Sequence, residues 1–424
     1  MKTTIVTFAL ATLLTLASTL TAQTSDSVSY FLFKLNPLGG TIAAANTINN
    51  RGWVMGTGNL AGDETAHATV WILGRRHDLG TLGGPNSAIA WPVKNNRGLV
   101  AGISETSIID PFGETWSCRY FFPAYTGHTC QGFAWKDNVM TALPTLGGSN
   151  GYASGVNNLG QIVGWAENTV HDTTCNPPQV LQFEAVLYGP NNQITELPPL
   201  PGDPDGAATA INDSQQVVGI SGICSNAVGG ASAAHAVLWE NGMPTDLGSL
   251  GGSEWNTPTA INKNGDIVGF SDLPGDENGL NFHAFLWTAS GGMEDLGALP
   301  GHAISEALGI NDRGLIVGES CVDATFTDCK AVIWHNKIIA DLNTLVPRGS
   351  MTLVFANDIN SSGEIAGGAF DPTTEQSPAF LAVPTLAGAP PVATGNVSPS
   401  IILPRSARRQ LLQRLPFLPR PGGQ

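Results

Sequence analysis

The stretch HAFLWTASGGMEDLGALPGH, residues 283–302, decides how this chain folds, because close copies of it occur elsewhere. HAVLWENGMPTDLGSLGG spans residues 235–252, and HATVWILGRRHDLGTLGG spans residues 67–84. Each copy holds an apolar run, a turn containing Gly, and a second short run that is followed by Gly-Gly in two copies and by Pro-Gly in the copy at residues 283–302. This pattern predicts two short β-strands joined by a tight turn.

A second signature alternates with the first: an apolar residue, Asn, two further residues, usually Gly, and an apolar pair before another Gly. INKNGDIVG, residues 261–269, is an example. The signature occurs seven times, at intervals of 46 to 62 residues, with its Asn at Asn49, Asn95, Asn157, Asn212, Asn262, Asn311 and Asn360. Because Asn and Gly tolerate positive φ, each copy predicts a tight turn between two more strands.

The two signatures together predict repeated units of four short strands. Such strands cannot bury a core alone, so the units must stack, and a period near 49 residues is typical of a β-propeller blade. We therefore predict an all-β fold, a seven-bladed β-propeller with four short antiparallel strands per blade; another stacked β-repeat is the alternative. The seventh unit lacks a fourth strand, so we expect residues 31–34 to pair beside residues 379–383 and close the ring.

The chain divides into three segments. Residues 1–22 combine Lys2 with a short apolar run, which predicts a secretory signal peptide rather than a membrane anchor. Residues 23–384 hold the repeats, and no later run is long enough to span a bilayer. Residues 385–424 are rich in Pro and Arg and are expected to form a flexible basic tail; a short amphipathic turn against the acidic body or the envelope surface is the alternative.

The formal net charge of the chain is −15. An acidic surface repels nucleic acid and anionic lipid, so nucleic acid is excluded as a partner. Solubility alone also accounts for such a charge. A monomer is expected.

The repeats resemble those of the extracellular HAF-repeat proteins, which are named after a His-Ala-Phe tripeptide. The full tripeptide begins at His283, and His-Ala without the Phe begins at His67 and at His235. The Asn-x-x-Gly and Leu-Gly-Gly elements carry the rest of the resemblance, over about residues 30–384. The resemblance implies an exported repeat protein and identifies no catalytic residues.

All six cysteines lie in long loops that the predicted topology gathers on one face of the ring. Export favours disulfides, and proximity favours two pairs within single loops, Cys118–Cys130 and Cys321–Cys329. Cys175 and Cys224 then remain, at equivalent places in adjacent blades. No Cys/His spacing of a zinc site occurs, so no metal ligands are assigned.

Rigid scaffolds usually bind through their long loops, so candidate ligand-binding residues are sought there. Aromatic rings with nearby carboxylates suit sugars, by stacking and hydrogen bonding. The candidates are Trp116, Tyr120, Tyr125, Trp165, Trp255, Asp110, Glu114, Asp276 and Glu277. The alternative is that these aromatic side chains only pack beneath the loops.

Two classes of function follow. The favoured prediction is a secreted or periplasmic, non-catalytic scaffold that binds a glycan or a protein through the long-loop face. The alternative is a propeller enzyme acting on polysaccharide, a hydrolase or lyase, in which carboxylates or a His outside the repeat pattern on the long-loop face act as acid–base groups. These His residues are His128, His171 and His302. No cofactor is assigned, although residues 203–206 and 275–278 are weak calcium candidates.

Overall fold

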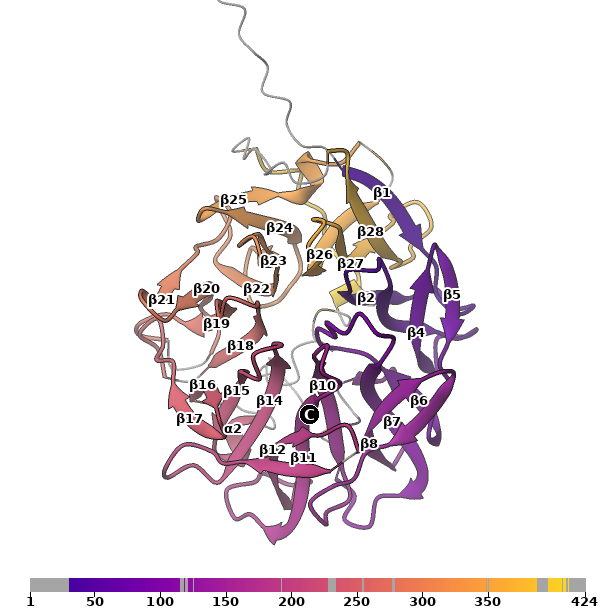
Figure 1. Cartoon of the computed structure of the whole chain (residues 1–424). Helices are drawn as coiled ribbons and strands as arrows, with labels where there is room; N and C mark the ends of the chain where they lie inside the picture. Colours follow the sequence, from indigo (N-terminus) through magenta and orange to yellow (C-terminus); the bar gives the residue numbers. More distant parts are fainter. Residues whose placement is uncertain are drawn as a thin grey trace, which may run out of the picture.

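The computed structural model describes residues 30–114, 118, 121–124, 126–191, 193–227, 234–253, 255–276, 279–347, 349, 351–386, 396–405, 407, 408 and 411. These residues form seven four-stranded antiparallel sheets, arranged as blades around a central axis (Figure 1). The predicted seven-bladed β-propeller is confirmed. The predicted signal peptide, residues 1–22, lies outside the described residues.

In the first three blades, four consecutive strands lie side by side in chain order. Blade one contains β2 (Ala43–Ile48), β3 (Val54–Asn59), β4 (Ala66–Ile72) and β5 (Arg75–Asp78). Blade two contains β6 (Gly83–Ala88), β7 (Val100–Ile109), β8 (His128–Lys136) and β9 (Val139–Ala142). Blade three contains β10 (Gly151–Val156), β11 (Ile162–His171), β12 (Leu181–Tyr188) and β13 (Ile194–Leu197).

The next three blades repeat this arrangement. Blade four contains β14 (Asp205–Ile211), β15 (Val217–Gly222), the short helix α2 (Cys224–Ala227), β16 (His235–Glu240) and β17 (Met243–Asp246). Blade five contains β18 (Asn256–Ile261), β19 (Ile267–Asp272), β20 (Phe282–Thr288) and β21 (Gly292–Asp295). Blade six contains β22 (Ile304–Ile310), β23 (Ile316–Cys321), β24 (Cys329–His335) and β25 (Ile338–Asp341), followed by the 3-10 helix η1 (Leu342–Thr344).

Blade seven joins the two ends of the repeat region. Its strands are β26 (Thr352–Ile359), β27 (Ile365–Phe370), β28 (Ala379–Pro384) and, at the outer edge, β1 (Tyr30–Leu35). β1 runs antiparallel to β28, from Tyr30 opposite Pro384 to Leu35 opposite Ala379, and Figure 1 shows indigo β1 beside golden β28. The predicted closure of the ring by the N-terminal strand is therefore confirmed.

The second Gly of each Asn signature has a steric role. In blade five, a Cβ atom added at Gly269 would lie only 2.1 Å from the main-chain oxygen of Thr257 on the neighbouring strand. The pairing of β18 with β19 shifts register at this place, between Pro258 and Ala260, so the two backbones approach unusually closely. Only glycine fits there, which explains why Gly ends every copy of the Asn signature.

The seven signature Asn side chains form a closed ring of hydrogen bonds between blades. Each side-chain amide nitrogen donates to the main-chain oxygen of the equivalent Asn in the next blade, at 2.7–3.3 Å. Each Oδ1 atom accepts main-chain N–H groups of its own turn; that of Asn49, for example, accepts from Arg51 and Trp53 at 3.0 Å. Each Asn therefore shapes its own turn and ties it to the next one.

Apolar side chains fill the centre of the ring on the side away from the Asn turns. One buried cluster draws members from blades two to seven, including Trp91, Tyr152 and Phe270, and Ala44 of blade one packs against it. Because it contacts every blade, this cluster lies on the axis. It also holds the disulfides of the long loops, so it lies toward the long-loop face.

The C-terminal segment departs from the expectation of a flexible tail. Leu403, Ala407 and Leu411 are buried in the axial cluster, and the yellow segment near the C-terminus lies inside the ring in Figure 1. The main-chain N–H of Leu403 donates to Thr327 O at 2.8 Å, and Lys330 Nζ donates to Pro399 O at 2.9 Å. For the described part of residues 385–424, the expectation is wrong, because spaced apolar side chains anchor the segment. The described residues contain no helix long and apolar enough to cross a membrane.

Candidate functional site

The loops of the propeller divide between two faces as the repeat predicts. In each antiparallel blade, the Asn turns and the turns between strands three and four share one face, and the loops between strands two and three share the other. Strand two has six residues in five blades but ten in β7 and β11. The hairpins of blades two and three therefore project farther on the long-loop face than those of the other blades.

The tips of these two hairpins carry exposed apolar side chains. Ile108 and Ile109 are each 62% exposed, Phe112 is 47% exposed, and Val170 is 52% exposed. The ring of Phe112 meets the ring of His171 edge-on, with centroids 5.7 Å apart, so the two tips touch. We call Ile108, Ile109, Phe112 and Val170 the hairpin patch.

A buried polar network holds the two tips together. Asn150 Nδ2 donates to Asp110 Oδ2 at 2.8 Å, and the main-chain N–H of Asn150 donates to Glu167 Oε2 at 2.8 Å. Glu114 Oε1 accepts the main-chain N–H groups of Val180 and Leu181, at 2.8 and 2.7 Å. The segment after β7 is thus bonded directly to blade three, which fixes the relative position of the tips.

Burial sets the protonation of this network. It raises the pKa of Glu167 to about 8, and the negative charge of Glu114 adds to the increase. Glu167 is therefore mainly protonated at neutral pH. Burial likewise raises the pKa of Glu114. Asp110 and Glu114, predicted as ligand-binding residues, are buried here and hold the hairpins in place.

The two Trp candidates among the described residues are buried, contrary to the prediction that they stack on a sugar at the surface. Trp165 is 3% exposed and lies edge-on to Phe183, with centroids 5.8 Å apart. Trp255 is fully buried between Phe270 and Phe282, at 4.7 and 4.6 Å. Both rings belong to the axial cluster because packing against other aromatic rings removes more apolar surface from water than exposure on a loop.

The remaining candidates divide between loop structure and the undescribed part of the chain. Asp276 Oδ2 accepts the main-chain N–H groups of Leu280 and Asn281, at 2.6 and 2.5 Å, and so shapes its loop. The candidates that lie outside the described residues are Trp116, Tyr120, Tyr125 and Glu277.

Each repeated His side chain lies within hydrogen-bonding distance of an Asp side chain in the same blade. His67, His235 and His283 each place Nδ1 2.9–3.1 Å from an Asp of strand four, namely Asp78, Asp246 and Asp295. Off-register His302 is half-buried, and this burial lowers its pKa. His128 lies 2.8 Å from the hydroxyl of Thr126.

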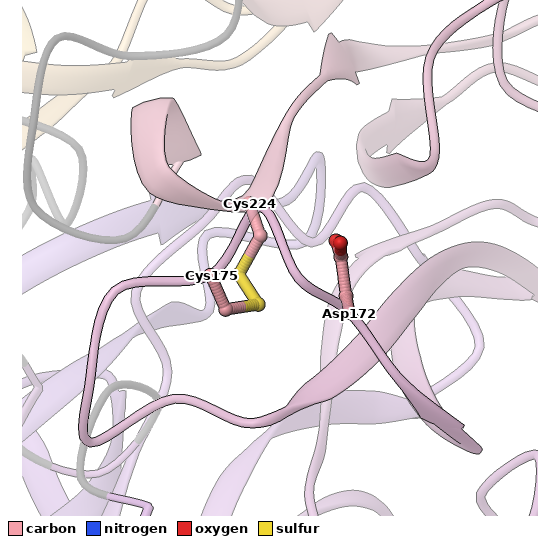
Figure 2. A group of neighbouring side chains, drawn as sticks. All are labelled: Asp172, Cys175 and Cys224. Atoms are coloured by element: carbon pink, nitrogen blue, oxygen red, sulfur yellow. A yellow bond between two sulfur atoms is a disulfide. The ribbon is translucent and has the colours of Figure 1, made fainter.

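All three predicted disulfides are present: Cys118–Cys130, Cys175–Cys224 and Cys321–Cys329. Figure 2 shows the Cys175–Cys224 bridge with the Asp172 carboxylate to one side of it. Among the described residues, these three side chains form the one group of three potential metal ligands whose ligand atoms lie within 4.8 Å of one another. The disulfide occupies both sulfur atoms, so this group offers no thiolate to a metal.

A group of carboxyls lies beside this bridge, between blades three and four; of this group, only Asp205 was part of a calcium candidate predicted from the sequence, the weak one at residues 203–206. Asp172 and Asp205 are hydrogen-bonded to each other, and the pKa of Glu184 responds to the charges of Glu196 and Asp172. Glu184 and Glu196 take the places of His and Asp in the His–Asp pairs of other blades. The signal in the sequence is that blade three differs from the other blades at these two positions of the repeat.

Comparison with known proteins returns the fold alone. No protein-family model and no curated protein matches the chain. A streptogramin B lyase and the virginiamycin B lyase from Staphylococcus aureus each have a TM-score of 0.47, at 10% and 12% identity; they cover 84% of this chain and 98% and 99% of their own. A puromycin hydrolase has a TM-score of 0.37 at 12% identity, covering 81% of this chain and 55% of its own. With TM-scores below 0.5, these likenesses carry no argument about function.

Proposed function

We propose that this protein is an exported β-propeller scaffold that binds a protein partner through the hairpin patch. The observation that carries the proposal is the exposure of Ile108, Ile109, Phe112 and Val170 on the two hairpins that project from the long-loop face. Apolar side chains gathered on a projecting surface typically mark an interaction site.

A protein suits the hairpin patch better than a glycan does. Three of its four side chains are aliphatic, and aliphatic groups offer no flat face on which a sugar ring stacks. The two described Trp candidates for such stacking are buried. An apolar patch within an acidic molecule of net charge −15 favours a partner with apolar side chains surrounded by basic ones.

The hairpin patch is held in a fixed conformation before any partner arrives. The buried bonds of Asp110, Glu114 and Glu167 connect both tips to strands of the ring. A preorganised surface loses less conformational entropy on binding than a flexible loop does. This rigidity supports a binding role for the two hairpins.

Export is the second part of the proposal. Three disulfides are typical of proteins that fold in an oxidising compartment. The apolar run within residues 1–22 supports the same conclusion from the sequence. Membership of the HAF-repeat proteins remains part of this proposal.

The test compares two double variants of the tagged protein as bait in the secreted and envelope fractions. Ile109→Ser with Val170→Ser changes the hairpin patch, whereas Val139→Ser with Leu159→Ser removes exposed apolar groups from the opposite, tight-turn face. We expect a protein bound by wild type and control to bind the patch variant at least about tenfold more weakly, because each central truncation costs more than about 1 kcal/mol. Equal retention by both variants, or no retained protein, would contradict the proposal.

A glycan array on the same three proteins tests the other predictions from the sequence. Binding to a sugar that both variants retain would favour a glycan ligand elsewhere on the ring. Release of sugar or unsaturated product from a polysaccharide would favour the alternative of a propeller enzyme, which stays a prediction.

A further inference from the structure

Three departures from the repeat meet between blades three and four. Blade three has Glu184 where blades one, four and five have His, and Glu196 where they have Asp. Blade four begins with Asp205 where blades two and three have Asn86 and Asn150. Two of the changes put a carboxyl in place of His or Asn, and the third puts the longer Glu side chain in place of Asp. Carboxyls therefore stand at both places where blades one, four and five have a His–Asp pair.

The loop that carries Asp172 completes this cluster. The Asp172 carboxylate accepts the main-chain N–H and the hydroxyl of Thr174, each at 2.7 Å, and is also hydrogen-bonded to the carboxyl of Asp205. The Cys175–Cys224 disulfide ties the same loop to α2 of blade four, as Figure 2 shows. Asp172 is therefore held against the start of blade four by covalent as well as polar links.

Glu184 is the observation that points to a ligand. Its side chain is 5% exposed, and its Oε2 atom is buried without a hydrogen-bond partner. None of the ion pairs among the described residues includes Asp172, Glu184, Glu196 or Asp205. A buried carboxyl oxygen without a hydrogen-bond partner, in a side chain that feels the negative charges of Glu196 and Asp172, costs stability unless it binds protons or a cation.

We propose that Asp172, Glu184 and Asp205 bind a calcium ion between blades three and four, with Glu196 at the exposed side of the site. The donors are all hard oxygen atoms, which calcium prefers, and the disulfide excludes the sulfur ligands that zinc would take. The oxygen atoms of these three carboxylates do not all lie within 4.8 Å of one another, so binding requires the side chains to move closer together. Calcium tolerates irregular geometry, whereas magnesium requires a near-ideal octahedron.

Protons compete with the ion for the same oxygen atoms. Burial raises the pKa of Asp205 to about 9, and the hydrogen bond that its carboxyl donates to the Asp172 carboxylate adds to the increase. Burial raises the pKa of Glu184 to about 8, and the charges of Glu196 and Asp172 add to it.

The test uses residues that the other blades already place at these positions. The variant Glu184→His with Asp205→Asn restores the repeat and is expected to fold. The control Asp137→Asn removes one exposed carboxylate from a turn of blade two. Each chelator-treated protein is unfolded thermally at one fixed pH, with calcium chloride, magnesium chloride, or sodium chloride of equal ionic strength.

We expect millimolar calcium to raise the unfolding temperature of wild type and of Asp137→Asn by at least about 3 °C. Magnesium raises it less, and the double variant shows no calcium-specific rise. Equilibrium dialysis with calcium on wild type and on the single variant Asp205→Asn gives a second readout, which does not depend on unfolding. No calcium-specific rise in wild type, or an equal rise or equal calcium uptake in the variants, would overturn the proposal.

Discussion

The side-chain amide of Asn360 donates a hydrogen bond of 3.1 Å to the main-chain oxygen of Asn49, across the joint between the last blade and the first. This bond closes a ring of seven equivalent bonds. The strand pairing of β1 with β28 closes the same ring at its outer edge. The two ends of the repeat region are therefore joined both near the axis and at the rim.

The first prediction concerns the Asn ring. Asn360→Ala removes the bond that Nδ2 donates to the main-chain oxygen of Asn49 and the two bonds that Oδ1 accepts from the main-chain N–H groups of Ser362 and Glu364. Leaving buried main-chain groups without partners should lower the free energy of unfolding by about 1–3 kcal/mol. Urea unfolding measures this, with Asn191→Ala, at an exposed turn of blade three, as the control. A loss equal to that of the control would show that the ring adds no stability.

The second prediction concerns the pH dependence of stability through Glu167. Its pKa is raised in the folded protein to about 8, whereas an unfolded Glu titrates near about 4.3. The folded state thus binds a proton that the unfolded state has lost, so this contribution is complete below about pH 4 and is lost as the pH rises to about 8.

Glu167→Gln mimics the protonated side chain at every pH. Between pH 5 and pH 8, urea unfolding should show a smaller fall in stability for this variant than for wild type, by at least about 1 kcal/mol. Parallel curves for the two proteins would argue against protonation of Glu167 in the folded state.

The third prediction concerns the C-terminal segment. Leu403 is 1% exposed in the axial cluster, whereas its neighbour Ile402 is 82% exposed. Leu403→Ala should lower the free energy of unfolding by about 2–5 kcal/mol, because it removes buried apolar surface and leaves a cavity. Ile402→Ala should change it by less than about 0.5 kcal/mol. Similar values for the two variants would mean that the segment does not pack in the ring.

The fold was predictable because the repeat is dense. Asn turns at regular intervals define the blades, and the missing fourth strand after Phe380 indicates which strand closes the ring. The disulfide pairs followed from loop proximity in that topology. The interblade bonds of the Asn side chains did not follow, because a turn signature describes one blade and these bonds join two.

The candidate site was less predictable because exposure depends on packing. Trp165 was predicted to lie outside the repeat and to bind a ligand. It instead holds the same place in strand two as Ile103, Ile220 and Phe270 of blades two, four and five, and it packs as they do. The hairpin patch depends on how far β7 and β11 extend, which loop length alone does not give. Burial of Leu403 depends on a contact between distant parts of the chain.

The most direct test of the account is a cross-link between β1 and β28. Phe33 and Leu381 lie directly opposite each other, and the six natural cysteines are all disulfide-bonded, so Phe33→Cys with Leu381→Cys introduces the reactive thiols. With a short bis-maleimide, the account predicts one intramolecular cross-link, identified as a joined peptide pair by mass spectrometry. Modification of both thiols without that link, or links between molecules alone, would contradict the closed ring that places the hairpins of blades two and three side by side.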